Sequence, residues 1–109
     1  TLMILKVFLE DQIYPIEIPD YIVNEAEDFF SILDNDMNQG WQMSHIWIDE
    51  PDAHQRCQIV ADKLLTALTN DDQKTGVMLS AYILNRMPGT NEVHLSVTGD
   101  MNEHVISGD

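Results

Sequence analysis

The sequence is short of three things: cysteine, basic residues and long apolar runs. A single cysteine, Cys57, in 109 residues allows no internal disulfide and no cysteine-based zinc framework. Lysine and arginine total 5 against 19 aspartates and glutamates, which gives a formal net charge of −14. A chain this negative is not expected to bind nucleic acid or anionic lipid directly. No stretch approaches the roughly 18 consecutive apolar residues that a membrane-spanning helix requires, so we expect no membrane association.

Common catalytic signatures are also missing. There is no Gly-x-Ser-x-Gly motif, no Gly-x-x-x-x-Gly-Lys loop and no Gly-x-Gly-x-x-Gly fingerprint. Cys57 falls within the apolar stripe of a predicted helix, whereas a reactive thiol needs an electropositive and partly exposed setting. These observations favour a binding protein over an enzyme, and they indicate no cofactor.

Length and composition predict one domain. A chain of 109 residues with 44% hydrophobic residues has room for one core, which we place at residues 1–100, followed by a polar, flexible tail at 101–109. The first residues show no basic leader followed by an apolar segment and a cleavage site. We therefore expect a cytoplasmic protein, although a mature chain already trimmed of its signal would look the same.

Three segments show the patterns of β-strands. Residues 2–9 are almost continuously apolar, which is typical of a central strand, and residues 13–18 alternate after a short polar break. Pro15 cannot donate to a strand ladder, so the second strand is expected at a sheet edge. Residues 93–98 alternate again and predict the last strand.

Between these strands, the sequence predicts helices. The first begins at Asp20, and its apolar stripe either continues to about Ile48 or breaks at Gly40 and resumes. The second runs from about Asp52 to Thr69, and the third, apolar on every side, ends before Pro88. The predicted fold is therefore α+β with the order β-β-α-α-α-β. It has a small three-stranded sheet, a β hairpin plus the C-terminal strand, with helices packed on one face.

The sheet is expected to have an uncovered apolar face. Every second side chain of the first two strands points away from the helices. Each large apolar side chain left exposed there would lose about 1.5–3 kcal/mol of the free energy that burial provides. A second copy of the chain can cover such a face with one self-complementary patch, while a tail or loop folded across the sheet is the alternative. The predicted dimer interface contains Leu2, Ile4, Phe8 and Ile13.

The acidic residues are concentrated. No lysine or arginine occurs between Lys6 and Arg56, a stretch that holds twelve acids, so these carboxylates are expected to lack ion-pair partners. Such a surface either docks a basic protein or only keeps the chain soluble. The predicted docking residues are Glu25, Glu27, Asp28, Asp34 and Asp36.

Two groups of residues have the chemistry of metal ligands. Asp34-x-Asp36-x-Asn38-x-Gly40 resembles the opening of an EF-hand loop, but glycine stands at position 7 instead of 6, and His45 stands where a glutamate is required. A second group is His45, Asp49, Glu50, His54 and Cys57. The candidate metal ligands are Asp34, Asp36, Asn38, His45, Asp49 and His54.

The sequence thus predicts a small acidic protein–protein interaction module, homodimeric and docking a basic partner. One alternative is a protein that binds a divalent metal or a small ligand. Another is an acidic mimic of nucleic acid, for which the net charge has the right sign.

Overall fold

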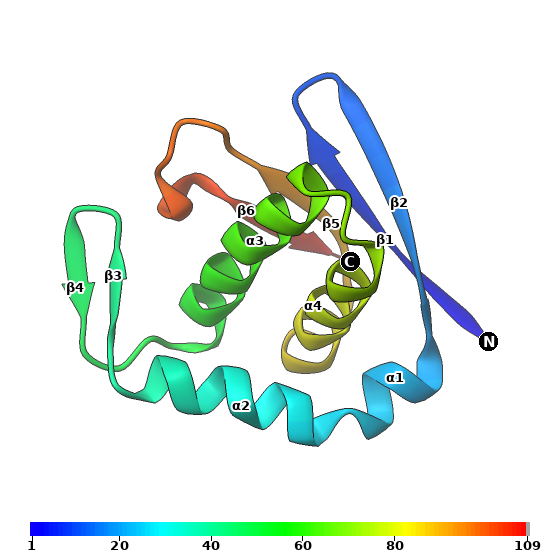
Figure 1. Ribbon diagram of the computed structural model, residues 1–109, viewed down its shortest axis with the longest axis horizontal. Coiled ribbons are helices and arrows are strands. Elements are labelled where there is room, and N and C mark those ends of the chain that lie inside the picture. Colours follow the sequence, from blue (N-terminus) through cyan, green and yellow to red (C-terminus); the bar gives the residue numbers. More distant parts are fainter. Residues whose placement is uncertain (109) are drawn as a thin grey trace.

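The computed structural model describes residues 1–108 and shows an α+β fold in which helices cover one face of a mixed sheet (Figure 1). The elements are β1 (Leu2–Leu9), β2 (Gln12–Pro19), α1 (Asp20–Glu25), α2 (Glu27–Asn38), β3 (Trp41–Met43), β4 (Ile46–Ile48), α3 (Ala53–Thr69), α4 (Gln73–Arg86), β5 (Thr90–Leu95), the 3-10 helix η1 (Met101–Glu103) and β6 (Val105–Gly108). None of the helices in residues 1–108 combines the length and the apolar content needed to span a bilayer.

The main sheet has the strand order β2-β1-β5-β6. β1 pairs antiparallel with β2 through a two-residue turn and parallel with β5, and β6 pairs antiparallel with β5. The edge position expected for β2 is confirmed. The sheet has four strands rather than the predicted three, because residues 105–108, which the sequence analysis assigns to the polar tail, form β6.

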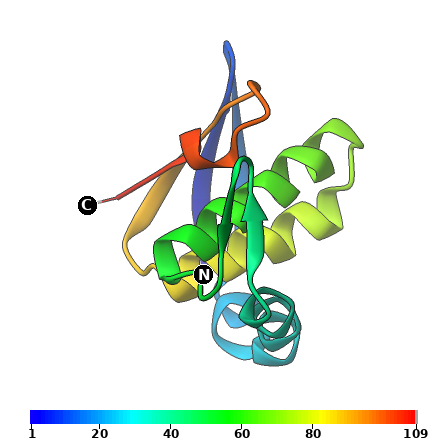
Figure 2. The same cartoon turned by 90° about the vertical axis from the view of Figure 1, so that its left-hand side faces the viewer.

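The core lies between this sheet and the helices α3 and α4, and Figure 2 shows the arrangement from the side. Leu5 and Val7 of β1 are fully buried, as their alternation predicts, and Val93 of β5 is buried beside them. Seven residues of helix α4 are buried: Gly76 and every residue from Leu79 to Leu84. Six consecutive residues cover all sides of a helix, so the prediction of a central helix that is buried all round is confirmed.

Capping residues define where the two long helices begin. The Asp52 carboxylate accepts a hydrogen bond from the Gln55 N–H at 2.8 Å, and the Gln55 side chain accepts one from the Asp52 N–H at 2.9 Å. This reciprocal capping box starts α3. At the start of α4, Asp72 accepts from the Thr75 N–H at 3.2 Å, and these contacts with Thr75 lower the pKa of Asp72.

The segment after α2 is a β hairpin and not a helix. The sequence left open whether the first helix continued to Ile48 or resumed after Gly40; instead, α2 ends at Asn38 and the chain turns into β3 and β4. Gly40 has a φ of +94°, which ends the helix, and a Cβ there would lie 2.4 Å from a ring carbon of Trp47. Glycine is therefore required by both the backbone and the packing of the hairpin.

The C-terminal segment is tied to the rest of the fold before it enters β6. The Asn102 side chain donates to the Met43 carbonyl at 3.2 Å, and the Met101 N–H donates to the Ser44 hydroxyl at 3.1 Å. From α3, the Gln58 amide donates to the carbonyls of Asn102 and His104 at 3.0 and 3.1 Å. These contacts hold residues 101–104 against α3 and the hairpin.

Candidate functional site

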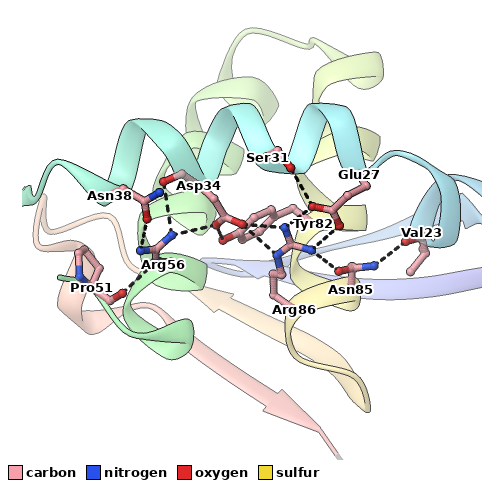
Figure 3. A network of polar contacts seen from close by, with 10 residues as sticks. All are labelled: Val23, Glu27, Ser31, Asp34, Asn38, Pro51, Arg56, Tyr82, Asn85 and Arg86. Carbon is pink, nitrogen blue, oxygen red and sulfur yellow. Dashed lines mark hydrogen bonds and ion pairs between the residues drawn. The ribbon is translucent and has the colours of Figure 1, made fainter.

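Both arginines of the chain converge on the carboxylate of Asp34 in α2 (Figure 3). Arg56 of α3 donates to Asp34 Oδ1 at 3.1 Å, and Arg86 of α4 donates to Oδ2 at 2.7 Å from Nη2 and 3.2 Å from Nε. The Tyr82 hydroxyl donates to Oδ1 at 2.5 Å. We call Asp34, Arg56, Tyr82 and Arg86, together with Glu27 and Asn38, the arginine clamp.

The outer contacts of the clamp reach both ends of α2. Arg86 donates to the two Glu27 carboxylate oxygens at 3.0 and 2.9 Å in the first turn. Arg56 donates to Asn38 Oδ1 at 2.7 Å in the last turn, and to the Pro51 carbonyl at 2.8 Å. The clamp therefore fastens the full length of α2 to α3 and α4.

The electrostatics of the clamp stabilise its charged state. Burial alone would raise the pKa of Asp34, but the hydrogen bonds from Tyr82, Arg86 and Arg56 outweigh it and hold that pKa below its usual value. The hydrogen bond to Glu27 raises the pKa of Arg86, and burial followed by the bond to Asp34 raises the pKa of Tyr82. Both Asp34 oxygens already accept hydrogen bonds from side chains of the protein. The clamp is therefore suited to holding α2 against α3 and α4, and not to binding a ligand.

The clamp corrects one sequence-based expectation. The carboxylates between Lys6 and Arg56 were expected to lack ion-pair partners, which is wrong for Glu27 and Asp34, because Arg56 and Arg86 arrive from later in the chain. The other three predicted docking residues are exposed and make no ion pair within residues 1–108; they are Glu25, Asp28 and Asp36.

The candidate metal ligands do not come together. Asp34 and Asn38 accept hydrogen bonds from the arginines, and Asp49 accepts one from the Trp47 indole at 2.6 Å. The remaining candidates are exposed; they are Asp36, His45 and His54. Throughout the described part of the chain, no three His, Cys, Asp or Glu side chains are close enough to hold a metal ion.

Two further polar or reactive side chains are buried. Cys57 is fully buried in α3, and this burial raises its pKa to about 12, so it is a core residue as predicted. His104, which the sequence analysis does not single out, is also buried: its Nδ1 accepts from the Ser96 N–H at 2.9 Å. Its Nε2 therefore carries the proton and donates to Asp62 at 3.1 Å. Both ring nitrogens serve to fix the loop before β6.

The sheet face turned away from α3 and α4, called here the open face, carries the predicted interface residues. Strand register places on it Leu2, Ile4, Lys6, Phe8, Ile13, Pro15, Glu17, Glu92, His94, Val105 and Ser107. Four of its aliphatic side chains are 52–56% exposed; they are Leu2, Ile4, Ile13 and Val105. Phe8 is half-buried and stacks on the His94 ring with centroids 4.3 Å apart.

The alternative cover that the sequence left open does not close this face. Residues 105–108, which could have folded across the sheet as a tail, lie within it as β6. Lys6, near the middle of the open face, is exposed and makes no ion pair among the described residues. The face therefore presents exposed apolar side chains around Lys6, with Glu17 and Glu92 on the neighbouring strands.

Comparisons with protein-family models, with curated proteins and with solved structures find no match for this chain.

Proposed function

We propose that the chain is a protein–protein interaction module that forms a homodimer through the open face and docks a basic partner through its acidic surface. The observation that carries the proposal is the exposure of Leu2, Ile4, Ile13 and Val105 together on one face of a regular sheet. Several exposed apolar side chains gathered on one face of a sheet are typical of association surfaces. A cytoplasmic location stays a prediction.

The edge of the sheet next to β2 is unsuited to association. Pairs along an antiparallel ladder alternate between hydrogen-bonded and non-hydrogen-bonded, and the two-residue turn makes Leu9 and Gln12 a hydrogen-bonded pair. Counting from that pair, Pro15 and Pro19 belong to non-hydrogen-bonded pairs, in which the N–H of a β2 residue would point away from β1 toward the free edge. Proline has no N–H, so an added strand would find two donors missing. The β2 edge therefore disfavours the addition of a strand from another chain.

The charges of the open face suit a two-fold contact. Glu92 of β5 lies directly across from Lys6, and Glu17 of β2 lies diagonally across from it. In a face-to-face dimer, the lysine of each copy can meet a glutamate of the other. The face has one lysine and two glutamates, so it is close to neutral, and most of the net charge of −14 lies elsewhere on the chain.

The size of the face predicts a dimer of modest affinity. Along β1 it measures about 26 Å and across four strands about 19 Å, or roughly 500 Å² in projection. That is below the roughly 600–1,000 Å² per partner of standard specific interfaces and in the range of weak, transient contacts, so we expect dissociation in the micromolar range.

Sedimentation of two matched variants tests the dimer. Ile4→Lys places a charge on the open face, and Ile46→Lys makes the same change on the β3–β4 hairpin, where Ile46 is 59% exposed. We expect dimers of the wild type and of Ile46→Lys at about 100 μM and monomers of Ile4→Lys. A wild-type monomer at that concentration, or equal behaviour of the two variants, would refute the open-face dimer.

A further inference from the structure

A groove of about 570 Å³ lies on another side of the molecule, between α2, β3, α3 and the start of α4. Its floor consists of the buried side chains of Leu33, Ile59 and Leu79, and its walls include the half-buried rings of Phe29 and Trp41. This volume is in the range of known binding pockets, and the lining is largely apolar.

The side of α2 next to the groove is both acidic and apolar. Residues four apart share a side of a helix, so Phe29 and Leu33 both face the groove, and Asp28, Ile32 and Asp36 form the adjoining rim. These three rim residues are exposed. The exposed Ile32 extends the apolar surface of the groove outward between two carboxylates that make no ion pair in residues 1–108.

The opposite rim also carries carboxylates, although Asp62 accepts a hydrogen bond from His104 and Asp72 caps α4. Asp62 and Asp72 line the groove from α3 and α4. The one cation in the lining is Lys63, whose ammonium lies 5.0 Å from the centroid of the Trp41 ring. The face of the Trp41 ring thus already interacts with a cation of the chain itself. The acidic residues on the two rims outnumber this one lysine.

We propose that this groove binds an amphipathic helix of a basic partner, with apolar side chains seated on the floor and lysines or arginines facing the rims. The inference rests on the docking part of the proposed function and identifies where and how the partner binds. A helix fits because most of the lining comes from α2, α3 and α4, whose backbone groups are already hydrogen-bonded within the helices and cannot pair with an extended strand. Charge complementarity between the acidic rims and basic flanks selects the partner.

The probe for the test is a designed helical peptide of leucine and lysine, about 18 residues long, which gives about five turns. Two control peptides accompany it: one with glutamate in place of every lysine, and one of the same composition whose order leaves no apolar side. Binding is followed by anisotropy of the labelled peptide and by the emission of Trp41 in the Trp47→Phe protein, in which Trp41 is the only tryptophan.

Two threonines of α3 provide matched protein variants. Thr66 lines the groove and Thr69 is not among its lining residues; both are exposed, and each hydroxyl donates to the carbonyl four residues earlier. Thr66→Lys obstructs the groove and adds a positive charge, so we expect peptide binding at least about tenfold weaker, whereas Thr69→Lys should change it less than about threefold. Both control peptides should bind at least about tenfold more weakly than the probe.

Several results would overturn the proposal. Equal binding by the Thr66→Lys and Thr69→Lys proteins would place the peptide elsewhere on the acidic surface, leaving basic docking intact but refuting the groove. If the control peptide without an apolar side bound as tightly as the probe, binding would rest on charge attraction alone and the apolar floor of the groove would play no part. Absence of binding by the probe would refute docking as well as the groove, while sedimentation of the same proteins reports separately on the open-face dimer.

Discussion

Removing the charge of Asp34 is the most direct test of how α2 is held in place. Asp34→Asn keeps the size of the side chain but replaces one oxygen by an NH₂ group. Because both oxygens accept from arginines, one donor of the asparagine must face a guanidinium donor. Two arginines that share one carboxylate then lose their common counter-charge.

The expected magnitude follows from the burial of the clamp. The side chains of Asp34, Arg56 and Arg86 are 19–23% exposed, so they lie between the surface and the deep interior. Exposed ion pairs contribute up to about 1 kcal/mol, whereas removing one partner of a buried pair costs about 3–5 kcal/mol. We expect Asp34→Asn to lower the free energy of unfolding by about 2–4 kcal/mol, which is a fall of about 8–16 °C in Tm.

The same substitution should change the acid limb of the stability profile. The folded-state pKa of Asp34 is lowered, so its stabilising contribution is fully present above the unfolded-state pKa of about 3.9. The contribution is lost as the pH falls through the lower folded-state pKa. The difference in unfolding free energy between the wild type and Asp34→Asn should therefore be constant near neutrality and shrink below about pH 4.

Urea unfolding followed by far-UV circular dichroism between about pH 3 and 7 measures both effects. The matched control is Asp36→Asn, which changes an exposed carboxylate on the other side of α2 and should stay within about 0.5 kcal/mol of the wild type. If the two variants were equally stable at neutral pH, the clamp would not be what fastens α2.

Two further substitutions test the packing elsewhere. Gly40→Ala and Gly99→Ala both place a Cβ at a φ near +93°, but only Gly40 has the Trp47 ring 2.4 Å from that Cβ, while Gly99 has nothing within 4 Å. We expect Gly99→Ala to cost about 1–2 kcal/mol in thermal unfolding and Gly40→Ala distinctly more; equal costs would mean that the hairpin moves freely away from Gly40. Ser80→Ala removes a buried hydroxyl that has no hydrogen-bond partner among residues 1–108, so the unfolding free energy should rise by up to about 1 kcal/mol. A loss of more than about 1 kcal/mol in urea unfolding would contradict that assignment.

The sequence predicted the elements whose signals are local and long. The continuous apolar run of β1, the proline-marked edge strand β2, and the capped helices α3 and α4 each extend over eight or more residues. The hairpin β3–β4 and the strand β6 were missed because strands of three and four residues are too short to show a period of two. Trp41, Trp47 and Ile48 also happen to fall on the helical stripe of α2, which made a continued helix plausible.

The open face could be predicted from the sequence, whereas the arginine clamp could not. The exposure of Leu2 and Ile4 follows from the alternation of side chains between the two faces of any strand, once helices are expected on one face of the sheet only. The clamp joins Asp34 to residues 22 and 52 positions away, and no pattern within a window of the sequence reports such a contact. Placing Asp34 outside the apolar stripe was correct, but that side of α2 faces the arginines and not the solvent.

The two proposed associations should respond oppositely to salt. With both arginines committed to Glu27, Asp34 and Asn38, the acids along the groove rims keep their full charge, and docking of a basic helix there should weaken steeply as salt screens the attraction. The open face is mainly apolar, and its two copies belong to chains of net charge −14, so screening should reduce their repulsion and strengthen the dimer. A single salt titration of dimer dissociation and of peptide binding therefore separates the two surfaces. Parallel weakening of both would mean that contacts between Lys6 and the glutamates of the other copy dominate the dimer, contrary to the mainly apolar contact inferred from Leu2, Ile4 and Ile13.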